Sequence, residues 1–183
     1  MHDTPDNPVE VVPAETGGRG QTLSRQALDA VLVAHRDWLA TEGIHGRQAD
    51  LRGTDLRGCS FWRADLRHAL LNGCDLRSTN LDHADLTQAS LVGARLNGAS
   101  LWESRLQQAV LAQADLHGAN LDHADLSDTD LTQVDLTGAS LWGARLHGAD
   151  LRLVIGVTPA QLATASSDGR TRLPPPGTAE APR

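Results

Sequence analysis

Leucine recurs at every fifth position along most of this chain. From Leu51 to Leu151 there are 21 consecutive central positions, and Phe61 is the one centre that is not leucine. The residue two before each centre is small, most often alanine, and the residue just before it is aspartate ten times. The unit is therefore Ala-Asp-Leu followed by two variable residues, and it runs without an insertion from residue 49 to residue 153.

A period of five fits neither an amphipathic helix nor an ordinary strand. On a helix of about 3.6 residues per turn the leucines would spiral around the axis and form no stripe. On a strand they would alternate between the two faces, because five is odd. The pattern instead predicts a chain that turns the same corner every five residues, with the leucine and the small residue inside and successive coils stacked at about 4.8 Å.

These Ala-Asp-Leu units resemble the pentapeptide repeat family. That resemblance implies an all-β solenoid: a right-handed quadrilateral parallel β-helix in which four pentapeptides make one square coil. For residues 49–153 it implies about five coils and a rod of roughly 25 Å.

The segments on either side of the repeats predict a cap at each end of the rod, since a solenoid needs its terminal coils covered. Residues 22–48 are expected to form a capping helix and linker, with Leu28, Val31 and Leu32 at helical spacing. Residues 154–168 are expected to form a C-terminal cap with a short helix, because Thr158-Pro159-Ala160-Gln161 is a capping box with proline at the first helical position. Residues 1–21 and the Pro-rich residues 169–183 are expected to be disordered.

Composition narrows the classes of function. The formal charge is -7 and every basic residue is arginine, which disfavours direct binding to nucleic acid. No apolar run is long enough to span a membrane, and the acidic, Pro-rich N-terminus lacks the pattern of a signal peptide, so we expect a cytoplasmic protein. Cys59 and Cys74 occupy small inward positions and are interpreted as core residues.

Catalytic and metal chemistry are the weaker interpretations of the polar residues. The aspartates fall at a fixed repeat position, where turn chemistry explains them, so we expect no enzyme and no cofactor. Arranging the sequence with four pentapeptides per coil stacks His83, Glu103 and His123, which are potential metal ligands. An open face without supporting contacts for the rings favours a solvated charge ladder instead, and no metal site is predicted.

One side of the predicted coil carries the strongest functional signal. Outward positions on that side hold, in order along the rod, Trp62, Asp82, Trp102, Asp122 and Trp142. Tryptophan is enriched among the anchors of protein interfaces, so we predict a rigid protein-binding scaffold with this stripe as its docking surface. The alternative interpretation is that this stripe is a homodimer face, covered by a second copy of the chain.

Charge suggests a second hypothesis. Between Leu106 and Ala144 the chain has no arginine but six aspartates, which define a candidate acidic patch: Asp115, Asp122, Asp125, Asp128, Asp130 and Asp135. Some pentapeptide repeat proteins protect DNA gyrase by presenting an acidic rod shaped like duplex DNA, so this resemblance implies a DNA mimic as the alternative function. Two observations favour the scaffold over the DNA mimic. The net charge over residues 49–153 is only -5, and the unbroken repeat has no insertion that could form a projecting loop.

Overall fold

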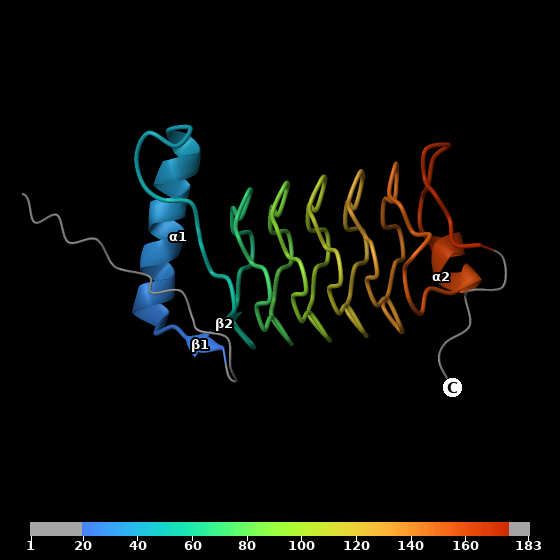
Figure 1. Cartoon of the computed structure of the whole chain (residues 1–183), viewed down its shortest axis with the longest axis horizontal. Coiled ribbons are helices and arrows are strands. Elements are labelled where there is room, and N and C mark those ends of the chain that lie inside the picture. The colour runs from blue at the N-terminus through green and yellow to red at the C-terminus, as the bar shows by residue number, and fades with distance from the viewer. Residues whose placement is uncertain (1–19, 176–183) are drawn as a thin grey trace, which may run out of the picture.

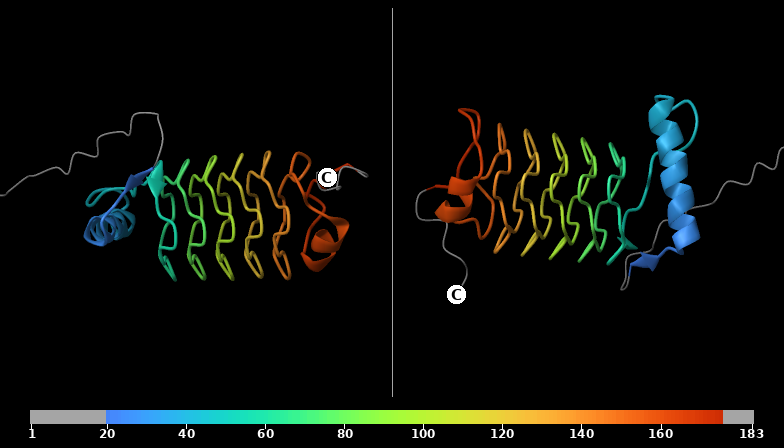
Figure 2. Two further views of the ribbon diagram at one scale, coloured as in Figure 1. Left: turned by 90° about the horizontal axis from the view of Figure 1, so that it is seen from below. Right: turned by 180° about the vertical axis from the view of Figure 1, so that it is seen from behind.

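The computed structural model describes residues 20–175, which form an elongated coil with a helix at each end (Figure 1). The named elements in chain order are β1 (Gln21–Thr22), α1 (Arg25–Ala40), β2 (Thr54–Asp55) and α2 (Pro159–Thr164). Between β2 and α2 the backbone advances in stacked coils, which both views of Figure 2 show edge-on. Neither helix within residues 20–175 has the length and apolarity needed to cross a membrane.

Single parallel bridges hold the coils together. Ser60 pairs with Asn80, which in turn pairs with Ser100, and the same step of four pentapeptides recurs at nearly every fifth position through the repeats; the step from Asp130 to Asp150 is the exception. Each coil therefore has four sides of five residues, and side chains four repeats apart lie above one another. This register decides which surface residues are neighbours.

A tight turn at each corner allows every central leucine to point inward, although the repeat has an odd number of residues. The N–H of Leu81 donates to the carbonyl of Ser100 in the next coil at 2.7 Å. The carbonyl of Leu81 accepts the N–H of Ala84, three residues on, at 3.0 Å. Two residues after a centre the backbone has positive φ, for example +58° at His83 and +63° at Gly93, as type II turns require. This conformation explains why glycine is frequent at the last repeat position.

Replacing a corner glycine tests this requirement for positive φ. Gly93→Val should lower the free energy of unfolding by about 1–2 kcal/mol, because a β-branched residue is strained in the left-handed region. A Cβ added at Gly93 has no atom within 4 Å, so we expect the loss to come from the backbone conformation. Gly93→Asn is the matched control and should lose less, since asparagine tolerates this conformation. Equal losses for both variants in urea unfolding would contradict the explanation.

The interior is a column of leucines lined by small residues. The centres from Leu51 to Leu151 are at most 2% exposed, and the alanines two before a centre are buried with them at nearly every repeat. The buried threonines at the small position form local hydrogen bonds: the Thr79 hydroxyl donates to the Leu76 carbonyl at 2.6 Å. The buried Ser104 hydroxyl, at the same repeat position, has no partner among residues 20–175. The Cys74 thiol donates to the carbonyl of Leu51 at 2.7 Å, and burial raises its pKa. Cys74 is thus part of the core, as the repeat predicts, whereas Cys59 is half-buried.

Helix α1 lies against the first coil (Figure 1). It begins after Ser24, whose side chain accepts the N–H of Ala27 at 3.1 Å, and its buried residues are Leu28 and His35. Just before it, β1 pairs in parallel with β2 through Gln21↔Thr54 and Thr22↔Asp55. The first coil therefore gains backbone partners as well as apolar cover. Gln21, placed by sequence in the tail 1–21, belongs to this strand pair.

A buried histidine joins α1 to the repeats. His35 Nδ1 accepts the N–H of Ala49 at 3.0 Å, so the ring must be neutral at that nitrogen, and Nε2 is buried without a partner among residues 20–175. Burial lowers the pKa of His35 below its ordinary value, while the nearby carboxylate of Asp65 opposes the shift. The backbone of Arg67 also opposes it, whereas the charges of His68 and Arg67 add to it.

This contact predicts that acidification loosens α1. The folded state favours neutral His35, so its contribution to stability is present above the unfolded pKa of about 6.5 and is lost as the pH falls toward the lower folded pKa. His35→Gln keeps an acceptor for Ala49 but does not titrate. Urea unfolding between pH 5 and pH 7.5 should therefore show a shallower pH dependence for the variant. An unchanged slope would assign the pH dependence to other groups.

Beyond the repeats the chain makes one more turn of the solenoid. Ile155 pairs with Asp135, Ser166 with Arg145, and Arg172 with Asp150, so each successive bridge spans one residue more than the one before. Helix α2 occupies part of this turn and begins with a Thr158–Gln161 capping box. Because Arg172 still pairs with the repeats, residues 169–175 differ from the tail expected at 169–183; residues 176–183, like 1–19, lie outside the described residues.

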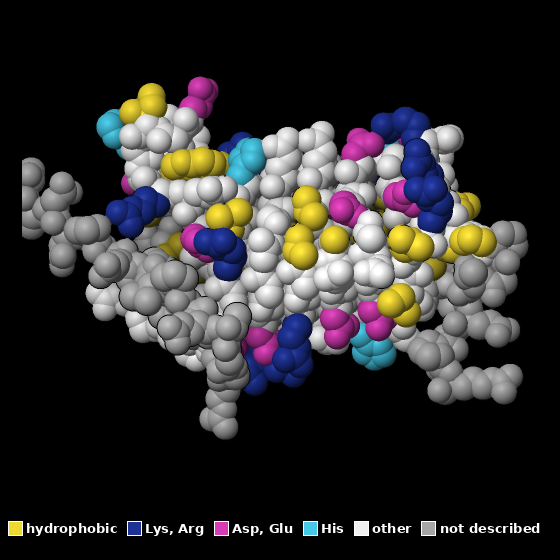
Figure 3. All heavy atoms as spheres, in the orientation of Figure 1, with side chains coloured by type: hydrophobic (Ala, Val, Ile, Leu, Met, Phe, Trp, Pro, Cys, Tyr) yellow, Lys and Arg dark blue, Asp and Glu magenta, His cyan; other side chains and the backbone are white. Residues whose placement is uncertain are grey.

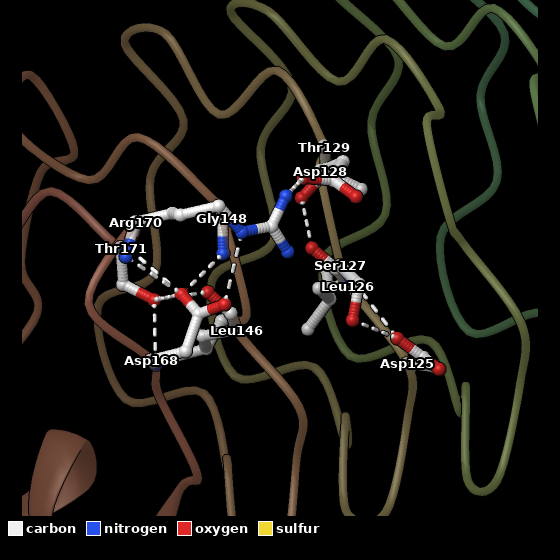
Figure 4. A network of polar contacts seen from close by, with 10 residues as sticks. All are labelled: Asp125, Leu126, Ser127, Asp128, Thr129, Leu146, Gly148, Asp168, Arg170 and Thr171. Atoms are coloured by element: carbon white, nitrogen blue, oxygen red, sulfur yellow. Dashed lines mark hydrogen bonds and ion pairs between the residues drawn. The ribbon is translucent and has the colours of Figure 1, made fainter.

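Polar side chains fix this last turn, as Figure 4 shows. Asp168 Oδ1 accepts the N–H of Gly148 and the hydroxyl of Thr171, both at 3.0 Å. Arg170 binds Asp168 and also reaches Asp128, at 2.9 Å, so it spans two coils. Burial opposes ionisation of Asp168, but the N–H groups of Gly148 and Arg170 hold its pKa far below its usual range.

Candidate functional site

Three tryptophans stand in line on one side of the rod, which we call the tryptophan side. Its centres are Phe61, Leu81, Leu101, Leu121 and Leu141. Trp62, Trp102 and Trp142 follow alternate centres and are 53%, 38% and 59% exposed. Successive tryptophans lie two coils apart, which is about 9.6 Å at the usual spacing of paired strands.

The aspartates between the tryptophans bind the rod itself. Asp82 Oδ1 accepts the backbone N–H of Trp102 at 3.1 Å together with the hydroxyl of Ser100. Asp122 Oδ1 accepts the N–H of Trp142 at 3.0 Å and the hydroxyl of Ser140. Both carboxylates thus tie one coil to the next and fix the backbone that carries the following tryptophan. Their role as partner contacts, expected from the sequence, stays a prediction.

Each of the two later tryptophans has a histidine from the preceding coil against its ring. His83 meets Trp102 with ring centroids 4.7 Å apart and planes at 75°, and His123 meets Trp142 at 4.6 Å and 76°. Edge-to-face contacts of this kind are favoured by the charge distribution of aromatic rings. The positive φ of both histidines places the side chains at the corner next to the tryptophan side. We call these two units the aromatic pairs.

The histidines do not converge with Glu103 as the stacked columns suggested. His83 Nδ1 lies 3.3 Å from Glu103 Oε2, but His123 packs on Trp142 instead. Residues 20–175 contain no group of three or more His, Cys, Asp or Glu side chains placed to hold a metal ion. At the position equivalent to Glu103, the second pair has Gly143, where a Cβ would fall 2.6 Å from His123 Nδ1. Gly143 therefore leaves room for the His123 ring.

Trp62 has a different neighbour. The guanidinium carbon of Arg63 lies 4.4 Å from the centroid of the Trp62 ring, which is the geometry of a cation–π contact. The repeats begin at residue 49, so no earlier coil supplies a histidine to the Trp62 ring. The tryptophan side therefore consists of two matched aromatic pairs and one tryptophan covered by a cation.

The aspartates before the centres carry out turn chemistry, as the repeat predicts. All ten accept the N–H of the residue two positions ahead, at 2.8–3.4 Å. In Asp-Leu-Arg units the arginine also returns to the carboxylate, as Arg57 does to Asp55 at 2.6 Å. Hydrogen bonds from Arg57 and Arg152 lower the pKa values of Asp55 and Asp150 to about 2. These carboxylates are structural parts of the corners.

The candidate acidic patch is distributed around the rod. Asp115 and Asp135 pair on one side, Asp122 lies on the tryptophan side, and Asp130 pairs with Val110 on a third side. On the fourth side Asp125 has Arg145 at 3.6 Å, and Asp128, at the corner beyond it, binds Arg170. Figure 3 shows one face of the rod, where charged side chains gather toward the ends and edges. The six aspartates are therefore spread over all four sides of the coil, and their role as an acidic patch stays a prediction.

Comparison with known proteins places the repeats in a family. The family model for pentapeptide repeats matches eight copies within residues 49–88, 63–98, 89–128 and 114–152, more than half of the chain. No curated protein sequence matches at a significant level.

Several solved structures are similar to this chain. Rfr23 from the cyanobacterium Cyanothece 51142 is 27% identical over 72% of this chain and 68% of its own, with a TM-score of 0.34. A pentapeptide repeat protein from the Arabidopsis thaliana thylakoid lumen is 30% identical over 64% of this chain and 74% of its own, with a TM-score of 0.31. QnrB1, a plasmid-mediated fluoroquinolone resistance protein, is 23% identical over 70% of each chain, with a TM-score of 0.36.

The five-residue repeat, the four-sided coils and the family match agree with one another. The family is defined by this structural repeat, and its members are generally structural or binding proteins. This chain belongs to the pentapeptide repeat family and folds as a right-handed β-helix solenoid.

Proposed function

We propose that the chain is a non-enzymatic scaffold that binds another protein through its tryptophan side. The observation that carries this proposal is the line of three exposed tryptophans, spaced two coils apart on a continuously bridged backbone. Large aromatic side chains on a rigid support are typical anchors of protein interfaces, because little conformational entropy is lost when they are buried.

The energetics are adequate for specific binding. Covering about 100 Å² of each tryptophan would contribute roughly 2–3 kcal/mol per ring at about 25 cal/mol per Å². The surrounding serines and asparagines are small and form hydrogen bonds within the rod, as Asn80 does with the N–H of Asp82 at 2.9 Å. These small side chains leave the outward faces of Trp102 and Trp142 open to a partner, whereas Arg63 covers Trp62.

An affinity experiment tests the proposal. The wild-type chain, Trp102→Ala and Leu153→Ala are immobilised and exposed to an extract of the source organism. Leu153 is the control because it is 62% exposed but lies off the tryptophan side. We expect the wild type and Leu153→Ala to retain the same protein, and Trp102→Ala to lose it. Identical retention by all three forms would show that the tryptophan side is not the docking surface.

The oligomeric state separates a partner from self-association. We expect the wild type and Trp102→Ala to have the same mass in solution by light scattering. A wild-type dimer that Trp102→Ala converts to a monomer would make the tryptophan side a homodimer face and would overturn the proposal of a separate partner.

A further inference from the structure

The two aromatic pairs repeat one another in composition and geometry. In each pair a histidine and a tryptophan from successive coils stand at about a right angle, at 75° in the first and 76° in the second. Trp102 is 38% exposed and Trp142 is 59% exposed, so both rings keep surface for a ligand. Two rings at a right angle offer a proline ring both a face and an edge to pack against.

The spacing of the pairs selects a conformation for the ligand. Asn120 pairs with Ser100 on one side and Ser140 on the other, so the pairs lie two coils, or about 9.6 Å, apart. A polyproline II helix advances about 9.3 Å per turn of three residues. Neighbouring residues on one face of a strand are only about 6.8 Å apart, and one helical turn rises about 5.4 Å. Two helical turns rise about 10.8 Å. Polyproline II is therefore the regular conformation whose repeat comes nearest to the 9.6 Å interval.

The charges around the pairs select the sign of the ligand. Glu103 lies beside His83 with 45% of its side chain exposed, and Asp82 and Asp122 follow the neighbouring centres. Arg63 covers Trp62, at the far end of the line. On the adjoining side Arg105 and Arg145 contact Asp85 and Asp125, at 3.6 Å each. The net charge beside the aromatic pairs is therefore negative and favours a basic ligand.

We propose that the two aromatic pairs bind a basic, proline-rich segment in the polyproline II conformation. Prolines three residues apart pack against His83–Trp102 and His123–Trp142, and a basic side chain between them faces Glu103. In other proteins, grooves lined by aromatic residues bind proline-rich segments. Such a segment already has the polyproline II conformation before it binds, so less conformational entropy is lost. This inference rests on the proposed function and specifies the chemistry of the partner.

Synthetic peptides test the proposal on the full chain. The probe is a fluorescent twelve-residue peptide of four Pro-Pro-Arg units, compared with four Gly-Gly-Arg units and four Pro-Pro-Glu units. Fluorescence anisotropy should show saturable binding of the Pro-Pro-Arg peptide, and affinity at least about tenfold weaker for the other two. Equal binding of the Gly-Gly-Arg peptide would reduce the interaction to charge alone and overturn the proposal, as would no binding of the Pro-Pro-Arg peptide.

Variants test whether the peptide binds at the aromatic pairs. Trp142→Ala should weaken binding of the Pro-Pro-Arg peptide at least about tenfold, whereas Leu153→Ala, which changes an exposed side chain off the tryptophan side, should alter it less than about twofold. His123→Gln removes the second ring while retaining a residue type that adopts positive φ at Gln88, so its fold is preserved. His123→Gln should weaken the affinity for the Pro-Pro-Arg peptide about threefold or more. Equal losses for Leu153→Ala and Trp142→Ala would contradict the two-pair site.

The outcome is separable from that of the proposed function. A protein that is retained in a Trp102-dependent manner but is not displaced by saturating Pro-Pro-Arg peptide would leave the scaffold standing and overturn the proline-rich class of partner. Displacement of that protein by the Pro-Pro-Arg peptide, with no displacement by the Gly-Gly-Arg peptide, would support both.

Discussion

Leu101→Ala should lower the free energy of unfolding by about 3 kcal/mol, within the range of roughly 2–5 kcal/mol typical for buried leucine. Leu101 is fully buried, and the register of four repeats per coil places Leu81 and Leu121 in the coils on either side of it. Its bridged backbone cannot collapse into the space left by the side chain, because the neighbouring N–H and carbonyl groups are held by both adjacent coils. Urea unfolding monitored by circular dichroism would measure the loss.

Leu153→Ala is the matched control, since it removes the same atoms from a side chain that is 62% exposed. Its effect should stay within about 0.5 kcal/mol, as for most surface substitutions. Comparable losses in the two variants would mean that the interior of the rod is less closely packed than the burial of its leucines indicates.

Trp102→Ala should weaken the affinity for the partner protein by about thirtyfold, equivalent to about 2 kcal/mol of binding free energy, because Trp102 is the central anchor of the three tryptophans. The melting temperature should hardly change. The indole contacts His83 at the surface, while the N–H that Asp82 accepts belongs to the backbone and remains in alanine. Isothermal titration with the isolated partner gives the affinity, and calorimetry gives the melting temperature. Unfolding of the variant, or unchanged binding, would make the tryptophan side structural.

The repeat could be predicted from sequence because each unit repeats the same local solution. A leucine every fifth residue, a small residue before it and an aspartate between them specify an inward pair and a hydrogen-bonded corner at every step. The aligned tryptophans follow from the same arithmetic, since every fourth repeat returns to the same side. Such inferences need only the period and the hydrogen-bonding capacity of aspartate.

Contacts between side chains of successive coils were not predictable in the same way. The columns placed His83 and His123 with Glu103, but the direction of each ring depends on the corner backbone, which leans His123 onto Trp142. The sequence does contain a signal for the aromatic pairs. The segment Asn-Leu-Asp-His occurs one coil before Trp102 and again one coil before Trp142. Trp62, without such a coil, has Arg63 instead.

The short helix of the last turn was predicted from its capping box, whereas the register of that turn against the repeats was not. After Leu151 the leucines at every fifth position stop, and the register is set by long-range polar contacts such as Asp168 with Gly148 and Arg170 with Asp128. Neither contact has a local sequence pattern. The buried contact of His35 with Ala49 likewise joins a helix to a distant coil and could not be read from the helix pattern alone.

The register of four pentapeptides per coil gives the tryptophan side a repeating unit of two coils, or 40 residues. Deleting one pentapeptide would turn every later side by one quarter of the coil, and deleting a whole coil would set Trp102 directly beside Trp62 without the intervening aspartate. Only a step of two whole coils preserves the alternation, and Asn-Leu-Asp-His-Ala-Asp-Leu indeed occurs at both Asn80 and Asn120. Duplication of that unit would add one aromatic pair at an unchanged interval, so the valency of the surface can evolve without any alteration of the fold.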